Sequence, residues 1–236
     1  MEDMYEYNGR ISKLNHKKAQ NIHLLSLNKL HVSMESSVEI MDNEGNLLFY
    51  YEPGKTIASS AINNKKNEVY YVNENGALFL YNYETNHTTN VDIQLYPIPK
   101  QMLFDELNQS IYYHDNESIY ELNLKSLRLS KLIKDNIPIQ SIVYHKNKKV
   151  IYFSTSVSGK IYQIDIGNGR PKLIHQPMSA KGAALSLDSD KNILYFSRSN
   201  GRDIQIQSMD LINESIHHNL TLFNVNDIRY FVVKDV

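Results

Sequence analysis

Hydrophobic and polar residues alternate in short runs along most of the chain, and polar turn residues separate the runs. Four of the runs read LFLYNY, IYELNL, IYQIDI and IQIQSM, in which apolar or aromatic residues recur at every second position. A period of two residues is expected of a β-strand that packs one face against a core. The turns before these runs are rich in Asn, Ser and Gly, and Asn75-Gly76 and Asn200-Gly201 are strong hairpin signals. The pattern predicts an all-β chain built from hairpins.

The predicted strands recur with a regular period. Four central tyrosines, spaced 42, 40 and 43 residues apart, hold the same place in successive segments: Tyr70, Tyr112, Tyr152 and Tyr195. We interpret them as structural positions of the repeat. Periods of about 40–45 residues are typical of propeller blades, whereas a β-sandwich gives no reason for a fixed period. We therefore predict an all-β β-propeller of four-stranded antiparallel blades.

The two ends of the chain bear on the number of blades. Residues 22–51 resemble the last three strands of a blade, and residues 227–236 resemble a lone first strand. If the terminal strand pairs antiparallel with a strand in residues 22–40, the shared blade closes five blades without a free edge. The alternative is an incomplete six-bladed ring. Residues 1–21 are expected to form a poorly ordered N-terminal extension, and residues 22–236 the propeller.

Composition narrows the possible functions. The chain has 236 residues, 42% of them hydrophobic, and a net charge of −1. A balanced charge predicts no general affinity for nucleic acid, and no apolar run reaches the roughly 18 residues of a membrane span. The sequence has 17 Tyr and no Cys, which excludes disulfides, cysteine-based zinc sites and thiol nucleophiles.

Candidate catalytic chemistry is sparse. Some propellers hydrolyse lactones or esters at a calcium ion held by acidic residues, and the acids here lie in first-turn positions: Asp105, Glu106, Asp188 and Asp190. Solvated turns explain these residues better, because calcium needs six to eight converging oxygen ligands. Three histidines stand at or after strand ends without ligand spacing: His114, His145 and His175. We expect no catalytic residue, no metal ligand and no cofactor, and keep the calcium-dependent hydrolase as an alternative.

Five N-x-Ser/Thr sequons occur, at Asn86, Asn108, Asn116, Asn213 and Asn219. They are candidate glycosylation sites and favour a secretory history. The N-terminal segment is polar and has no signal peptide. We therefore expect an extracellular protein if the N-terminus is incomplete, and a cytoplasmic one if it is complete.

Residues 179–211 resemble a YWTD repeat, the class B repeat of LDL-receptor-type propellers. The motif positions read Tyr195-Phe196-Ser197-Arg198 here, and the motif's acidic position is kept in one copy, at Asp115. In the family this acid helps to hold neighbouring blades together, so the resemblance implies different polar contacts between blades in this chain. It implies a non-catalytic, secreted ligand-binding module, expected to be a monomer, that engages a protein partner through one rim.

A second resemblance supports a different ligand. The segment NKKNEVYYVNENGALFLYNYET is similar to insect ommochrome-binding proteins, and the C-terminal stretch is similar to the yellow and royal-jelly proteins. The first likeness implies a secreted carrier of a small aromatic ligand or pigment. An aromatic-lined mouth would favour the carrier, and a flat rim with exposed aromatic side chains would favour a protein partner.

Overall fold

The computed structural model describes residues 4–7, 11–14, 19–26, 29–42, 46–133, 136–176, 182–199, 203–222 and 231–233. Every regular element within these ranges is a β-strand. Contacts divide the chain into two compact units. The first contains residues 16–115 and 119–131, and the second contains residues 2–15, 116–118 and 132–236.

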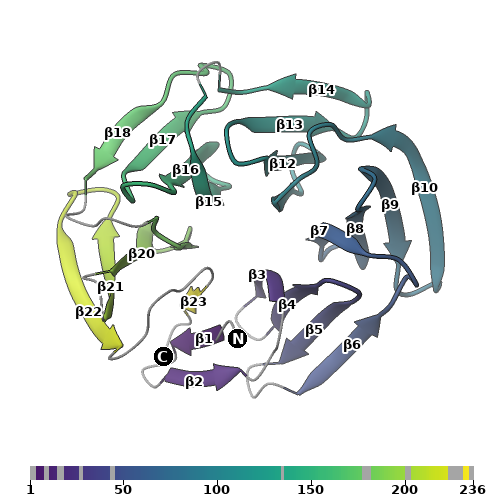
Figure 1. The fold of residues 1–236 in the computed structure, drawn as a ribbon, viewed down its shortest axis with the longest axis horizontal. Helices are drawn as coiled ribbons and strands as arrows, with labels where there is room; N and C mark the ends of the chain where they lie inside the picture. Colours follow the sequence, from purple (N-terminus) through teal and green to yellow (C-terminus); the bar gives the residue numbers. More distant parts are fainter. Residues whose placement is uncertain are drawn as a thin grey trace. The chain divides into compact units, whose positions relative to one another are not determined.

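The first unit contains three four-stranded sheets (Figure 1). Their strands are β3 (Ala19–Ser26), β4 (Lys29–Met34), β5 (Val38–Asp42) and β6 (Leu47–Tyr51); β7 (Ile57–Asn63), β8 (Glu68–Asn73), β9 (Ala77–Asn82) and β10 (His87–Gln94); and β11 (Gln101–Asp105), β12 (Ser110–His114), β13 (Ile119–Asn123) and β14 (Arg128–Lys131). In each sheet consecutive strands pair antiparallel. Each sheet therefore has the strand order predicted for a blade.

The second unit contains two further four-stranded sheets and one of three strands. The four-stranded sheets are β15 (Ile139–His145), β16 (Val150–Thr155), β17 (Ile161–Asp165) and β18 (Lys172–His175), followed by β19 (Leu185–Asp188), β20 (Ile193–Ser199), β21 (Ile204–Asp210) and β22 (Ile216–Leu222). The three-stranded sheet is formed by β1 (Met4–Tyr7), β2 (Ile11–Leu14) and β23 (Phe231–Val233).

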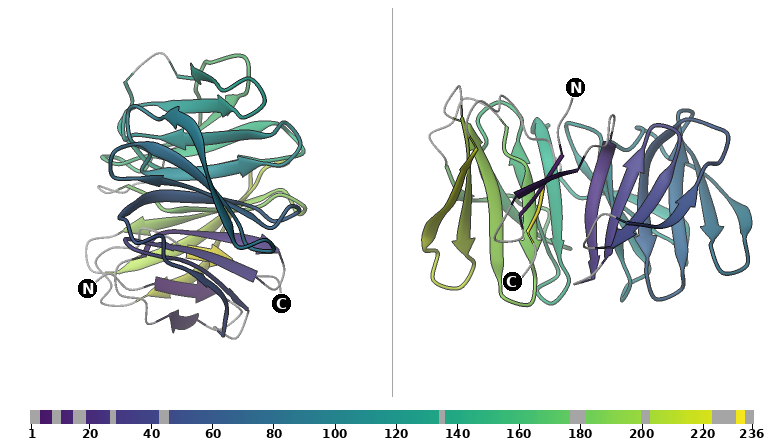
Figure 2. Two further views of the ribbon diagram at one scale, coloured as in Figure 1. Left: turned by 90° about the vertical axis from the view of Figure 1, so that its right-hand side faces the viewer. Right: turned by 90° about the horizontal axis from the view of Figure 1, so that it is seen from below.

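The two ends of the chain share a sheet, but with a different partner and direction from those predicted. β23 lies beside β1 (Figure 2) and pairs with it in parallel, with Tyr5 opposite Phe231 and Tyr7 opposite Val233. The predicted antiparallel pairing of the terminal strand with residues 22–40 is wrong. The reason is that β3 already supplies the innermost strand of the first sheet, so that sheet is complete with four consecutive strands. The domain boundary between residues 21 and 22 stays a prediction; β3 begins at Ala19, and β1 and β2 lie in residues 1–21.

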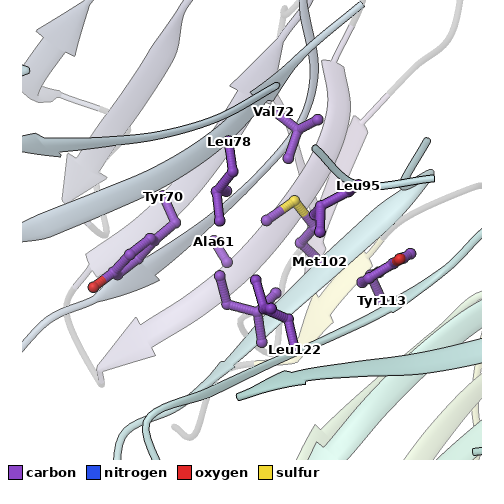
Figure 3. Close-up of a cluster of buried hydrophobic side chains, with 9 residues drawn as sticks. Ala61, Tyr70, Val72, Leu78, Leu95, Met102, Tyr113 and Leu122 are labelled. Atoms are coloured by element: carbon purple, nitrogen blue, oxygen red, sulfur yellow. The ribbon is translucent and has the colours of Figure 1, made fainter. Parts of the chain in front are cut away.

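The central tyrosines lie on the second strand of their sheets. Tyr70, Tyr112, Tyr152 and Tyr195 stand on β8, β12, β16 and β20, and all four are buried. Tyr70 belongs to a hydrophobic cluster that joins the second and third sheets of the first unit, where its neighbours include Leu78, Met102 and Leu122 (Figure 3). Alternate residues of a strand, such as Tyr70 and Val72 of β8, supply this cluster because every second side chain of a strand points to the same face.

Buried serines hold the start of the last four-stranded sheet in the second unit. The Ser154 hydroxyl donates to the Ala183 carbonyl oxygen, and the Ala184 N–H donates to the Ser197 hydroxyl over 2.8 Å. Ser154 and Ser197 occupy the same position of the repeat motif, one residue before the position of the family's acid. The Ser154 bond joins the two sheets, whereas the Ser197 bond lies within the last sheet, between β20 and the residue before β19.

Candidate partner-binding surface

A loop in the first unit presents an aromatic side chain to solvent. Residues 95–100, here called the Tyr96 loop, connect β10 to β11. Tyr96 is 84% exposed, the highest value for a large hydrophobic residue in the described part of the chain. Leu95 before it and Pro99 after it are buried. The loop is therefore anchored by buried residues on both sides of Tyr96, whereas the Tyr96 side chain itself packs little against the core.

Three hydrogen bonds fix the two ends of this loop. The Leu95 N–H donates to the Gly76 carbonyl oxygen over 2.8 Å, and the Gln94 side-chain amide donates to the Asn75 carbonyl oxygen over 2.7 Å. At the other end, the Lys100 N–H donates to the His114 carbonyl oxygen over 2.8 Å. Because both ends are held, a partner that contacts Tyr96 has less loop motion to restrict.

The turn that receives two of these bonds requires a glycine. Gly76 has a φ of +84°, and a Cβ atom there would lie 2.5 Å from the Leu95 carbonyl oxygen. The Asn73 side-chain oxygen accepts hydrogen bonds from the N–H groups of Asn75 and Ala77, each over 3.0 Å. The Asn-Gly signal in the sequence therefore marks both a hairpin turn and the support of the Tyr96 loop. Three exposed residues lie beside these bonds and supply a negative, a neutral polar and a positive group: Glu74, Asn75 and Lys100.

The residues at the end of β12, to which the Tyr96 loop is hydrogen-bonded, have a structural role. His114 is 3% exposed, its Nδ1 has no hydrogen-bond partner, and burial lowers its pKa to about 4. Tyr113 stacks on Tyr120 with 5.0 Å between ring centroids, and the Tyr120 hydroxyl donates to Asp115 over 3.3 Å. A buried imidazole that stays neutral near pH 7 fits a packing role better than a binding role.

The first unit also contains a cluster of stacked aromatic rings, here called the aromatic cluster. Its members come from the first two sheets: Phe49, Tyr51, Tyr71, Phe79, Tyr81 and Tyr83. The rings of Tyr51 and Tyr81 are stacked with 3.8 Å between centroids. The Tyr51 hydroxyl is 3.3 Å from that of Tyr71, and burial followed by this contact raises the pKa of Tyr71. Phe49, Tyr51, Phe79 and Tyr83 are half-buried, so the cluster is in part accessible.

Two of the four turn acids bond within their own turns, and the other two form ion pairs with lysines of the corresponding turns in a neighbouring sheet. In the first unit, Asp105 is buried and accepts the N–H of Leu107 over 3.0 Å, while Glu106 pairs with Lys65 over 3.1 Å. In the second unit, Asp188 accepts the N–H groups of Asp190 and Lys191, and Asp190 pairs with Lys146 over 3.4 Å. Among the described residues, no group of three or more His, Asp or Glu side chains is placed to hold a metal ion.

The other two histidines are not brought together. His145 ends β15 and His175 ends β18, which are opposite ends of one sheet, because the first and fourth strands of an antiparallel meander run in opposite directions. His145 Nε2 lies 3.1 Å from the Asn192 side-chain oxygen, and the His175 ring lies 4.9 Å from that of Phe196. Burial lowers the pKa of both imidazoles.

The candidate glycosylation sites differ in the accessibility of their side chains. Asn86, Asn116, Asn213 and Asn219 are exposed. Asn108 is half-buried, and its side-chain nitrogen donates to Asp105 over 2.6 Å. A glycan at Asn108 would have to displace this bond, so the first four are the better candidates. Their modification stays a prediction.

Sequence reasoning did not single out Tyr96. The signal that could have found it is the run Tyr96-Pro97-Ile98-Pro99, in which an aromatic residue stands among prolines between two predicted strands. Proline restricts the loop backbone and favours a fixed connection. Exposure of the ring could not be read from the run itself, since it depends on how Leu95 and Pro99 pack.

Comparisons with known proteins bear on the fold alone. No family model matches the chain, and no curated protein matches it significantly. Within the described residues, no helix is long and apolar enough to span a membrane. Similar solved structures include the β-propeller domain of Cps50 (Swd1) from Myceliophteria thermophila, with a TM-score of 0.61, 11% identity, and coverage of 89% of this chain and 73% of that chain.

Two further structures are similar. The nidogen/laminin complex has a TM-score of 0.60 and 13% identity, covering 83% of this chain and 93% of that chain. Hydrazine synthase from Kuenenia stuttgartiensis has a TM-score of 0.67 and 12% identity, covering 94% of this chain and 72% of that chain. These likenesses, together with the successive four-stranded sheets, confirm the predicted fold class: the chain has an all-β β-propeller fold.

Proposed function

We propose that this chain is a non-catalytic propeller module that binds a protein partner through the Tyr96 loop and the adjoining Asn73–Ala77 turn. The observation that carries the proposal is an 84% exposed tyrosine on a loop held at both ends. Tyrosine is enriched among the residues that dominate binding energy at protein interfaces. The fold supports a binding role as well, because propeller loops vary on a constant frame.

The polar surroundings of Tyr96 fit a protein partner. Glu74 and Lys100 are exposed near an aromatic centre, which resembles the usual arrangement of an apolar contact within a charged rim. Among the similar solved structures, one is a complex of two proteins, nidogen and laminin. Together with the YWTD resemblance and the exposed sequons, these points support the finer proposal of a secreted, glycosylated, YWTD-type module.

The test uses the full chain as bait with two matched variants. Tyr96→Ala removes the exposed ring, and Ile212→Ala removes an exposed apolar side chain from a turn of the second unit. We expect a partner from extracellular fluid to be retained by the wild type and by Ile212→Ala, and its Kd, measured with the purified partner, to rise at least tenfold with Tyr96→Ala. Equal affinity for the two variants would overturn the role of Tyr96.

The aromatic cluster favours a second candidate, a carrier of a small aromatic ligand. Its half-buried rings offer faces on which a planar ligand can stack. Titration with tryptophan-derived pigments should then quench tyrosine fluorescence, and Phe79→Leu should weaken the effect. Absence of quenching below roughly millimolar concentration, the weak end of specific binding, would count against the carrier and leave the protein-binding proposal untouched.

A further inference from the structure

The outer strand of the first sheet is unusually apolar. β6 reads Leu-Leu-Phe-Tyr-Tyr and contains no charged residue. Leu47, Leu48 and Tyr50 are 55%, 51% and 49% exposed. In the described part of the chain β6 pairs with β5 on one side and is the last strand of its sheet. It therefore combines an open backbone edge with exposed apolar side chains.

The other outer strands carry features that discourage pairing with a further strand. The sequences of all five contain charged residues or histidines: Lys13 in β2, His87 and Asp92 in β10, Arg128 and Lys131 in β14, Lys172 and His175 in β18, and His217 and His218 in β22. In β10, the pairing with β9 shifts register between Asn90 and Gln94, and Asp92 within this irregular stretch has a φ of +55°. Charges and irregular backbone are the usual protection of edge strands, and the sequence of β6 has no such charge.

An irregularity in β6 shapes the edge further. Ile40 pairs with Phe49 and Met41 pairs with Leu47, so Leu48 is an extra residue relative to β5. A bulge re-aims side chains at the point where it occurs. Here both Leu47 and Leu48 are exposed, next to a regular stretch from Phe49 to Tyr51 that can accept hydrogen bonds from a partner strand.

Carboxylates stand beside the apolar edge. Glu39 lies opposite Tyr50 on β5, and the Tyr50 hydroxyl donates to Glu52 over 2.8 Å. That hydrogen bond is the main cause of the raised pKa of Tyr50, and the charges of Glu52 and Glu39 contribute as well. A second copy of this chain, paired strand to strand, would bring like charges together, which is unfavourable. The edge therefore fits a basic partner better than itself.

We propose that β6 accepts an extended segment of a partner protein as an added strand, and that this segment carries apolar residues and at least one Lys or Arg. Backbone hydrogen bonds to the edge provide the affinity, and side-chain contacts with Leu47, Leu48 and Tyr50 provide the selection, as in strand addition generally. The basic residue pairs with the exposed Glu52. This surface is independent of the Tyr96 loop and does not rest on the function proposed above.

The probe is a displayed library of random nine-residue peptides, selected against the full-length wild-type chain. We expect enriched peptides to combine β-branched or aromatic residues with Lys or Arg. Leu48→Lys should weaken the best synthetic peptide at least tenfold. Leu173→Lys, the same change at a 44% exposed leucine of the outer strand β18, should leave its affinity unchanged. Matching melting temperatures of the two variants would show that both are folded.

A second measurement separates strand addition from ordinary surface binding. Methylation of alternate backbone nitrogens on one edge of the peptide should abolish binding, and methylation on the other edge should not, because one edge of an added strand faces β6. Three results would each overturn the proposal: no enrichment, equal binding to Leu48→Lys, or equal binding of both methylated peptides. A dimer seen by sedimentation that Leu48→Lys dissociates would also overturn it, since the occupant would then be a second copy.

Discussion

At the scale of single residues, Gly76 in the Asn73–Ala77 turn allows the close backbone contact that holds the Tyr96 loop. Gly54 and Gly76 both have positive φ, of +70° and +84°. They differ in their surroundings, because a Cβ at Gly54 would meet nothing within 4 Å and one at Gly76 would approach a carbonyl oxygen. The first glycine is needed for its conformation alone, and the second also for a close approach.

This difference gives a prediction for the two alanine variants. Gly54→Ala should lower the free energy of unfolding by about 1 kcal/mol, the cost of a left-handed non-glycine residue. Gly76→Ala should lower it by clearly more, because the new Cβ must also move the backbone of Leu95. Urea unfolding of both variants measures the effect. Equal losses would show that the contact with Leu95 is not made in solution.

Burial of histidines makes the stability of the fold depend on pH. The pKa of His114 falls to about 4 in the folded chain from an ordinary value of 6.5, so the unfolded chain binds its proton first as the pH falls. Stability from this group is present above pH 6.5 and is lost between pH 6.5 and 4. The lowered pKa values of His145 and His175 act in the same direction.

We therefore expect the free energy of unfolding to fall from pH 7 to pH 5, with about 2 kcal/mol of the loss due to His114. In His114→Gln this part of the loss should disappear. Ser126 is exposed, and Ser126→Ala, which removes no titratable group, should retain the wild-type pH dependence. Urea unfolding at the two pH values provides the measurement, and an unchanged slope in His114→Gln would contradict the assignment.

At the scale of elements, serines of the repeat make polar contacts at the start of the last four-stranded sheet. Ser141, Ser154 and Ser197 all bond the backbone of residues 183–185, where the chain enters β19. A buried N–H group that loses its acceptor carries the full cost of desolvation. Ser141 and Ser154 therefore hold the start of β19 to the preceding sheet, and Ser197 holds it to β20 of its own sheet.

Ser197→Ala should lower the free energy of unfolding by about 1–3 kcal/mol, because it leaves the buried Ala184 N–H without the serine oxygen. Ser126→Ala, which removes an exposed hydroxyl from a turn, should change it by less than about 0.5 kcal/mol. Thermal or urea unfolding distinguishes the two. Similar small losses in both would mean that water replaces the serine.

At the scale of the whole chain, β1 and β23 place residues near both ends in one sheet. Pairing between residues so distant in the sequence carries a large loop-closure cost, which the rest of the fold must offset. The pairing of β23 with β1 therefore depends on the stability of the sheets that lie between them in the sequence.

Deletion of residues 227–236 should lower the melting temperature by several degrees, since about 1 kcal/mol shifts it by 2–4 °C in a chain of this length. It should also promote association, because β1 would lose a neighbour. Deletion of residues 234–236 leaves β23 in place and should have little effect. If the longer deletion left a monomer with the wild-type melting temperature, the contribution of β23 would be refuted.

The sequence by itself determined the repeated unit. The tyrosine spacing, the alternating runs and the Asn-Gly turn depend on neighbouring residues, so the four-stranded sheets from residue 57 to residue 222 follow from local pattern. The sequence pattern missed β3, the first strand of the first four-stranded sheet, because its sequence, AQNIHLLS, does not alternate regularly between hydrophobic and polar residues. Only the tertiary structure decided that β23 pairs with β1, that Tyr96 is exposed, and that Glu106 and Asp190 pair with lysines of other turns. These features depend on contacts between segments far apart in the chain or on the packing of flanking residues, and no local pattern encodes them.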